Sequence, residues 1–144
     1  MTILQIASAI VELGAGLALL CCPSAAATLL IGAPPEGPAA LTVARVCGMA
    51  LLTLGVACGL ARGDTQSRAA RGLIVAMLIY DFGVAALLAF AAVGMELHGV
   101  ALWPAVALHG MMSVWCVACL RRTPVKLAMD SHVLNRSTME RGPR

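Results

Sequence analysis

Long apolar stretches separated by short polar segments dominate this chain. Four of these stretches are about 20 residues or longer, and they cover residues 3–22, 39–61, 69–94 and 100–120. An α-helix rises about 1.5 Å per residue, so about 20 apolar residues cross the roughly 30 Å hydrocarbon core of a bilayer. The pattern therefore predicts an all-α fold, a four-transmembrane-helix bundle.

A fifth apolar piece, residues 25–31, is too short to cross a bilayer. Pro23 stops or kinks the helix that precedes it, and Ser24 is a residue type that caps the start of a helix. The glycines and prolines that follow are typical of a loop. The sequence thus predicts a short interfacial helix between the first and second spanning helices.

The composition supports a membrane protein and divides the chain into two parts. Hydrophobic residues make up 60% of the chain and charged residues 12%, whereas soluble domains contain about 25% charged residues. We expect residues 1–122 to form the membrane domain and residues 123–144 to form a flexible, basic cytoplasmic tail. The net charge of +3 is explained by membrane topology and gives no indication of nucleic-acid binding.

The basic residues also predict an orientation. Of the ten lysines and arginines, all but Arg45 lie in the middle loop region, 62–71, or from Arg121 onward. Positively charged loops face the cytoplasm, which places the middle loop and the C-terminus on that side. With four spans the N-terminus is cytoplasmic too, and the predicted location is a bacterial inner membrane.

Each predicted span contains one ionisable residue that calls for an explanation. Glu12, Asp81 and His109 lie about 13–16 Å from the cytoplasmic ends of their helices, and Arg45 lies about 9 Å below the outer surface. A charged group at this depth is costly unless it is paired or faces a polar interior. Two interpretations stay open: structural pairing, or a polar cluster of Glu12, Arg45, Asp81 and His109 that binds a small ligand or carries protons.

Small residues follow a helical spacing in the second span. Gly55 and Gly59 are four residues apart, and Ala44 precedes Gly48 by four. Such spacing lets two helix backbones approach closely. We expect this helix to pack closely against another helix of the same bundle.

Six cysteines lie in apolar helices or at their ends, where a free cysteine behaves as a small hydrophobic residue. Thiolates also bind soft metals, so a pair at each membrane face, Cys21–Cys22 and Cys116–Cys119, would suit an ion such as Hg(II) or Cu(I). In size, span number and the Cys21–Cys22 pair the chain is similar to small mercury-resistance transporters. It departs from them because the pair lies at the outer helix end and no cysteine pair follows the fourth span.

The second half of the chain carries another resemblance, and it begins with the stretch from Ala44 to Arg62, ARVCGMALLTLGVACGLAR. It carries Arg45 three residues before Gly48, and the last span begins near Trp103–Pro104. With these features residues 3–120 resemble small bacterial four-helix membrane proteins of the DoxX-like kind. Some members of that group are linked with respiratory or thiol redox systems. The resemblance carries over no catalytic residue.

These observations favour a non-enzymatic protein, since the chain has no phosphate-binding glycine loop, no zinc-protease motif and no nucleophile elbow. The leading hypothesis is an accessory subunit or a binder of a small apolar ligand within the bundle. The alternatives are a soft-metal transporter and a membrane component of a quinone or thiol redox system. The expected partners are the lipid bilayer and either another membrane protein or a small apolar ligand; nucleic acid is not expected, and the sequence identifies no cofactor.

Overall fold

The computed structural model describes residues 1–64 and 67–122, and this part of the chain is built from helices. The long helices α1, α3, α4 and α5 are each apolar enough to cross a membrane, so they fit a multi-pass membrane protein and confirm the all-α prediction. The expected tail, 123–144, lies outside the described residues. The five helices are α1 (Thr2–Cys21), α2 (Pro23–Ile31), α3 (Gly37–Ala61), α4 (Arg68–Gly94) and α5 (Leu102–Arg122).

Helix α2 is the predicted short helix between the first two spans, although its first turn differs from the prediction. Pro23 is its first residue and Cys22 its N-cap, so Ser24 lies two residues beyond the N-cap position and does not cap the helix. Proline has no N–H to leave unpaired and is therefore favoured at this position. The Ser24 carbonyl instead accepts a hydrogen bond from the Thr28 hydroxyl at 2.8 Å.

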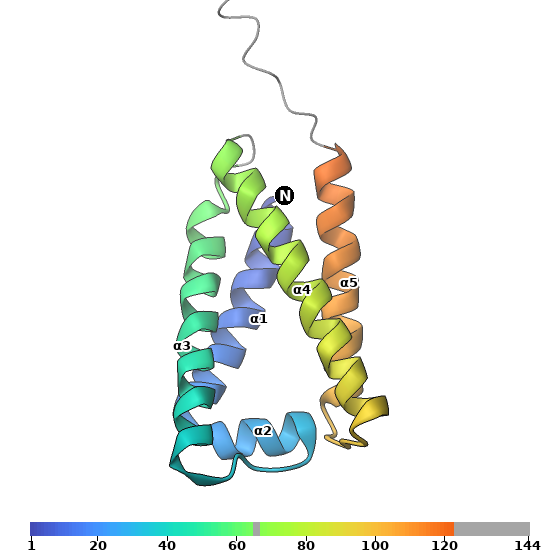
Figure 1. Cartoon of the computed structure of the whole chain (residues 1–144). Helices are drawn as coiled ribbons and strands as arrows, with labels where there is room; N and C mark the ends of the chain where they lie inside the picture. Colours follow the sequence, from blue (N-terminus) through green and yellow to red (C-terminus); the bar gives the residue numbers. More distant parts are fainter. Residues whose placement is uncertain (65–66, 123–144) are drawn as a thin grey trace, which may run out of the picture.

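The long helices form two pairs, α1 with α3 and α4 with α5 (Figure 1). Helix α2 lies across one end of the molecule and contacts α1, α3 and α5 (Figure 1). The segment before α5 is bonded to it, because the Ala101 N–H donates to the Leu29 carbonyl at 2.9 Å. A side chain at Gly99 would collide with the Leu30 carbonyl, so this close approach requires glycine.

The α1–α3 pair is packed backbone against backbone. A Cβ atom added to Gly16 would lie 2.7 Å from the Gly48 carbonyl oxygen, and one added to Gly48 would lie 2.8 Å from the Gly16 carbonyl oxygen. Gly55 faces α1 too, whereas a Cβ at Gly59 would meet only the Ala9 side chain, at 3.9 Å. The close packing is as predicted, but the glycines that contact α1 are Gly48 and Gly55. They are two helical turns apart, so they lie on the same side of α3. We call this line of contact between the two helices the seam.

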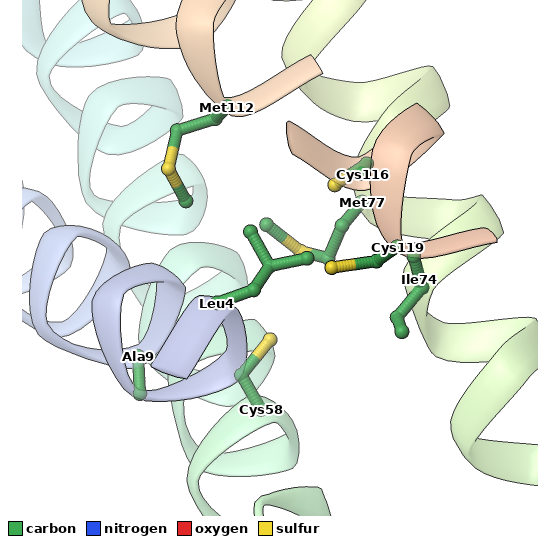
Figure 2. Packing of buried hydrophobic residues seen from close by; sticks show 8 residues of the cluster. All are labelled: Leu4, Ala9, Cys58, Ile74, Met77, Met112, Cys116 and Cys119. Carbon is green, nitrogen blue, oxygen red and sulfur yellow. The ribbon is translucent and has the colours of Figure 1, made fainter. Parts of the chain in front are cut away.

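A core of buried side chains joins the two pairs (Figure 2). The Leu4 side chain of α1 points toward Met77 of α4 and Cys119 of α5 (Figure 2). Sulfur atoms are unusually frequent in this core, in five of its eight residues. The core consists of Leu4, Ala9, Cys58, Ile74, Met77, Met112, Cys116 and Cys119.

Candidate functional site

Three helices each bring one ionisable side chain to the interior of the bundle. Glu12 of α1 and Asp81 of α4 are each 1% exposed, and the His109 side chain of α5 is 11% exposed. One potential ligand atom from each residue lies within 4.8 Å of the other two. Three residues that are far apart in the sequence are thus brought together at one depth of the helical bundle, among mostly apolar side chains.

Two hydrogen bonds connect these residues across the helices. The His109 Nδ1 atom lies 2.8 Å from Asp81 Oδ1. The Tyr80 hydroxyl donates to Glu12 Oε2 at 3.2 Å, which ties α4 to α1. The Tyr80 and His109 rings also meet edge to face, with centroids 5.7 Å apart. We call this set of four residues, Glu12, Tyr80, Asp81 and His109, the polar centre.

Several polar atoms at and near the polar centre are buried without a hydrogen-bond partner. They are Asp81 Oδ2, both side-chain amide atoms of Gln5, and the Ser8 hydroxyl oxygen. Gln5, Ser8 and Glu12 follow helical spacing, so they lie on one face of α1. An unpaired buried polar group costs about 1–3 kcal/mol in proteins, and most such groups find a partner. This face of α1 therefore has free bonding capacity toward the interior.

Arg45 does not join the polar centre, contrary to the expected cluster of four residues. Its side chain is exposed on α3, and in the described part of the chain it makes no hydrogen bond or ion pair. With 3.6 residues per turn, Arg45 lies on nearly the opposite side of α3 from Cys58, which is in the core. The two buried carboxylates consequently have no arginine beside them.

The cysteine pairs are likewise separated. Cys21 and Cys22 are exposed at the end of α1 next to α2, whereas Cys116 and Cys119 of α5 are buried in the core. No disulfide involves any of these four described cysteines. Among the described residues the group of His, Cys, Asp and Glu side chains close enough to hold a metal ion is Glu12, Asp81 and His109, without a cysteine.

A pocket of about 390 Å³ opens where the N-terminal end of α1 meets the C-terminal end of α5. Two of its wall residues, Leu4 and Cys119, belong to the core. Gln5 and Ser8 follow along α1 from this pocket toward Glu12, so polar atoms lie between the pocket and the polar centre. The pocket is lined by Met1, Thr2, Ile3, Leu4, Trp115, Cys119 and Arg122.

No known family model, curated protein or solved structure matches the chain. The case for a function therefore depends on the polar centre and its surroundings.

Sequence reasoning missed Tyr80, Gln5 and Ser8 as members or neighbours of the site. Gln5 and Ser8 precede Glu12 by seven and four residues, which places three polar side chains on one face of an apolar helix. That spacing was a usable signal. Tyr80 gave none, because a residue adjacent to Asp81 points in a different direction from the helix axis, and only the packing of α4 against α1 brings its hydroxyl to Glu12.

Proposed function

We propose that the chain is a small, DoxX-like protein of a bacterial inner membrane that binds a small ligand at the polar centre and catalyses no reaction. Both termini are cytoplasmic in this proposal, because the basic loop residues favour that orientation. The observation that carries it is the buried Asp81 carboxylate, which has one oxygen 2.8 Å from His109 and the other without a partner.

A purely structural role explains less of this arrangement. A structural ion pair stabilises a bundle when every buried atom is bonded, and a pair that leaves atoms unsatisfied is costly in an apolar environment. Here Asp81, Gln5 and Ser8 all retain unpartnered polar atoms. Ionisable residues within spans are characteristic of ligand, ion and proton sites in membrane proteins. A bound ligand that donates hydrogen bonds or carries a positive charge gives these polar atoms a partner.

The outer surface of the bundle supports the membrane part of the proposal. Large apolar side chains are exposed along the long helices, for example Ile10 of α1, Leu60 of α3 and Phe82 of α4. Such surfaces suit acyl chains or the spans of another membrane protein. An accessory subunit that carries its ligand to a larger assembly is consistent with both kinds of neighbour.

A second candidate, soft-metal transport, is favoured by the sulfur-rich core. Met77, Cys116 and Cys119 lie near the Leu4 side chain (Figure 2), and thioether and thiolate groups prefer soft ions such as Cu(I). The exposed Cys21 and Cys22 at the far end of α1 would then receive the ion. This candidate requires the Cys116 and Cys119 thiols, and the leading proposal does not.

Native mass spectrometry of the chain, gently extracted from its own membrane, tests the leading proposal. We expect a bound small species in the wild type, its loss in Asp81→Asn, and its retention in Glu96→Gln, a matched change at an exposed acid. A co-purifying quinone would favour a redox role for the same site. A wild-type chain that is empty but bound to another polypeptide would contradict ligand binding and favour an accessory subunit with structural polar residues.

A further inference from the structure

We propose that Glu12, Asp81 and His109 form a binding site for one divalent transition-metal cation of the Zn²⁺, Fe²⁺ or Mn²⁺ type. This inference rests on the proposed function and names the class of ligand that the polar centre takes. It begins from the distances: one nitrogen or oxygen atom from each residue lies within 4.8 Å of the other two.

The separation of these atoms is close to that of a metal's ligands. Zinc bonds to nitrogen and oxygen are about 2.0–2.2 Å long, so neighbouring ligand atoms of a tetrahedral ion lie about 3.4 Å apart. Atoms now within 4.8 Å reach that separation through side-chain shifts of about 1 Å. Facing helices of a bundle are a common place for such sites, with carboxylates and imidazoles that project inward.

The charges of the site favour a doubly charged cation. Glu12 and Asp81 carry two negative charges when ionised, and no arginine or lysine of the described residues contacts either carboxylate. Arg45 faces outward on α3. One divalent ion bound to two carboxylates and a neutral imidazole gives a site without net charge. Neutrality matters here because an uncompensated charge is costly at membrane depth.

An independent observation points to a missing cationic or donor partner. Asp81 is 1% exposed, and its Oδ2 atom is buried with no hydrogen bond. Its other oxygen lies 2.8 Å from His109 Nδ1, so the carboxylate is held against a second residue of the group. A metal ion gives this oxygen a partner that the described residues do not supply.

The donor set also selects among cations. Imidazole binds Zn²⁺, Fe²⁺ and Co²⁺ well, whereas Ca²⁺ and Mg²⁺ prefer oxygen alone. Soft ions such as Cu(I) and Hg(II) prefer the thiols, and the group of three contains no cysteine. The Tyr80 hydroxyl, 3.2 Å from Glu12, holds that carboxylate in place from outside the ligand shell.

Cobalt titration of the purified full chain in detergent micelles, stripped beforehand with a chelator, tests the inference. We expect one Co²⁺ per chain, visible d–d absorption, displacement by Zn²⁺, and no thiolate-to-cobalt charge-transfer band. Asp81→Asn and His109→Gln should each weaken binding at least tenfold. The matched changes Glu96→Gln and His98→Gln, at exposed positions of the loop before α5, should leave the affinity within twofold.

The outcomes separate this inference from the function on which it rests. Absent Co²⁺ binding, a thiolate charge-transfer band, or full affinity in Asp81→Asn each overturns the metal site. The wild-type spectrum reports the donor atoms directly, so the result stands even if a variant fails to fold. If native mass spectrometry finds an organic molecule that Asp81→Asn loses, only the metal assignment fails. If the wild type contains no small species by either method, both proposals fail.

Discussion

Helix α1 has two buried faces that are built in different ways. The face toward α3 contains Gly16, which lies so close to Gly48 that no side-chain atom fits between the helices. The face toward the bundle interior contains Gln5, Ser8 and Glu12, all buried, and the first two have no hydrogen-bond partner. The first face is apolar and closely packed, and the second is polar and incompletely bonded.

The difference separates stability from ligand binding within a single helix. In a bilayer, helices associate through close packing of small residues, because lipid already solvates apolar side chains. The α1–α3 seam supplies that packing and holds α1 in place. The adjacent face can then retain polar groups that weaken the fold, as binding sites commonly do. Two substitutions test this division, and a third tests which residues belong to the polar centre.

The largest expected effect comes from filling the seam. Gly48→Leu forces a side chain into the backbone of α1, where a Cβ atom alone would lie 2.8 Å from the Gly16 oxygen. We expect a loss of about 3 kcal/mol in the free energy of unfolding, at the upper end of the typical cost of overpacking, because the obstacle includes backbone atoms of α1. The measurement is the unfolding transition in mixed detergent micelles, titrated with a denaturing detergent.

Gly14→Ala is the matched control, because a Cβ atom at Gly14 meets nothing within 4 Å. Replacing a helical glycine by alanine where space allows changes stability by about 0.5–1 kcal/mol in the favourable direction. Equal losses in both variants would show that the loss in Gly48→Leu does not come from the close approach of α1 and α3.

The polar face should respond in the opposite direction. Gln5→Met replaces a buried amide, whose two polar atoms have no partner, with an apolar side chain of similar length. We expect the free energy of unfolding to rise by about 1–2 kcal/mol, because the cost of the unpaired amide disappears. Thermal stability of the solubilised chain, followed by the loss of monodisperse protein, measures the change.

Thr53→Val serves as the control for the polar face, since the Thr53 hydroxyl is exposed and already donates to the Ala50 carbonyl at 2.7 Å. It should give no gain. A loss of stability in Gln5→Met would mean that the amide has a bonded partner and that the polar face is more complete than we infer.

The smallest expected effect tests whether Arg45 belongs to the site. The cluster predicted from the sequence includes Arg45, and the polar centre does not. Arg45→Gln removes a positive charge at an exposed position of α3, without a partner in the described chain. We expect unfolding to change by less than about 0.5 kcal/mol and metal affinity to stay within twofold. Weakened Co²⁺ binding in this variant would place Arg45 in the site after all.

The positions of the helices could be predicted from the sequence because they depend on local composition. The expected spans 39–61 and 69–94 agree closely with α3 (Gly37–Ala61) and α4 (Arg68–Gly94). The start of α4 is set by a local interaction, in which the Ser67 hydroxyl accepts from the Ala70 N–H at 3.0 Å. Hydropathy and capping residues contain this information directly.

The candidate site could be predicted only in part. The depth of a residue along its helix follows from the sequence, but the direction in which its side chain faces around the helix axis does not. Glu12, Asp81 and His109 share a level and also face one another. Arg45 lies within a span too, yet its helix turns it outward, since the α3 seam is fixed by Gly48 and Gly55. Which of several small residues forms that seam depends on the shape of the partner helix.

The short helix α2 has a consequence for the order in which the chain assembles. It is synthesised before α3, but its contact with the segment before α5, through the Ala101 N–H and the Leu29 carbonyl, joins residues separated by half of the chain. That contact cannot form until residue 101 has been synthesised. Helix α2 can therefore contact α1 and α3 before its bond to the segment preceding α5 is made, and that bond completes the packing of α2 last.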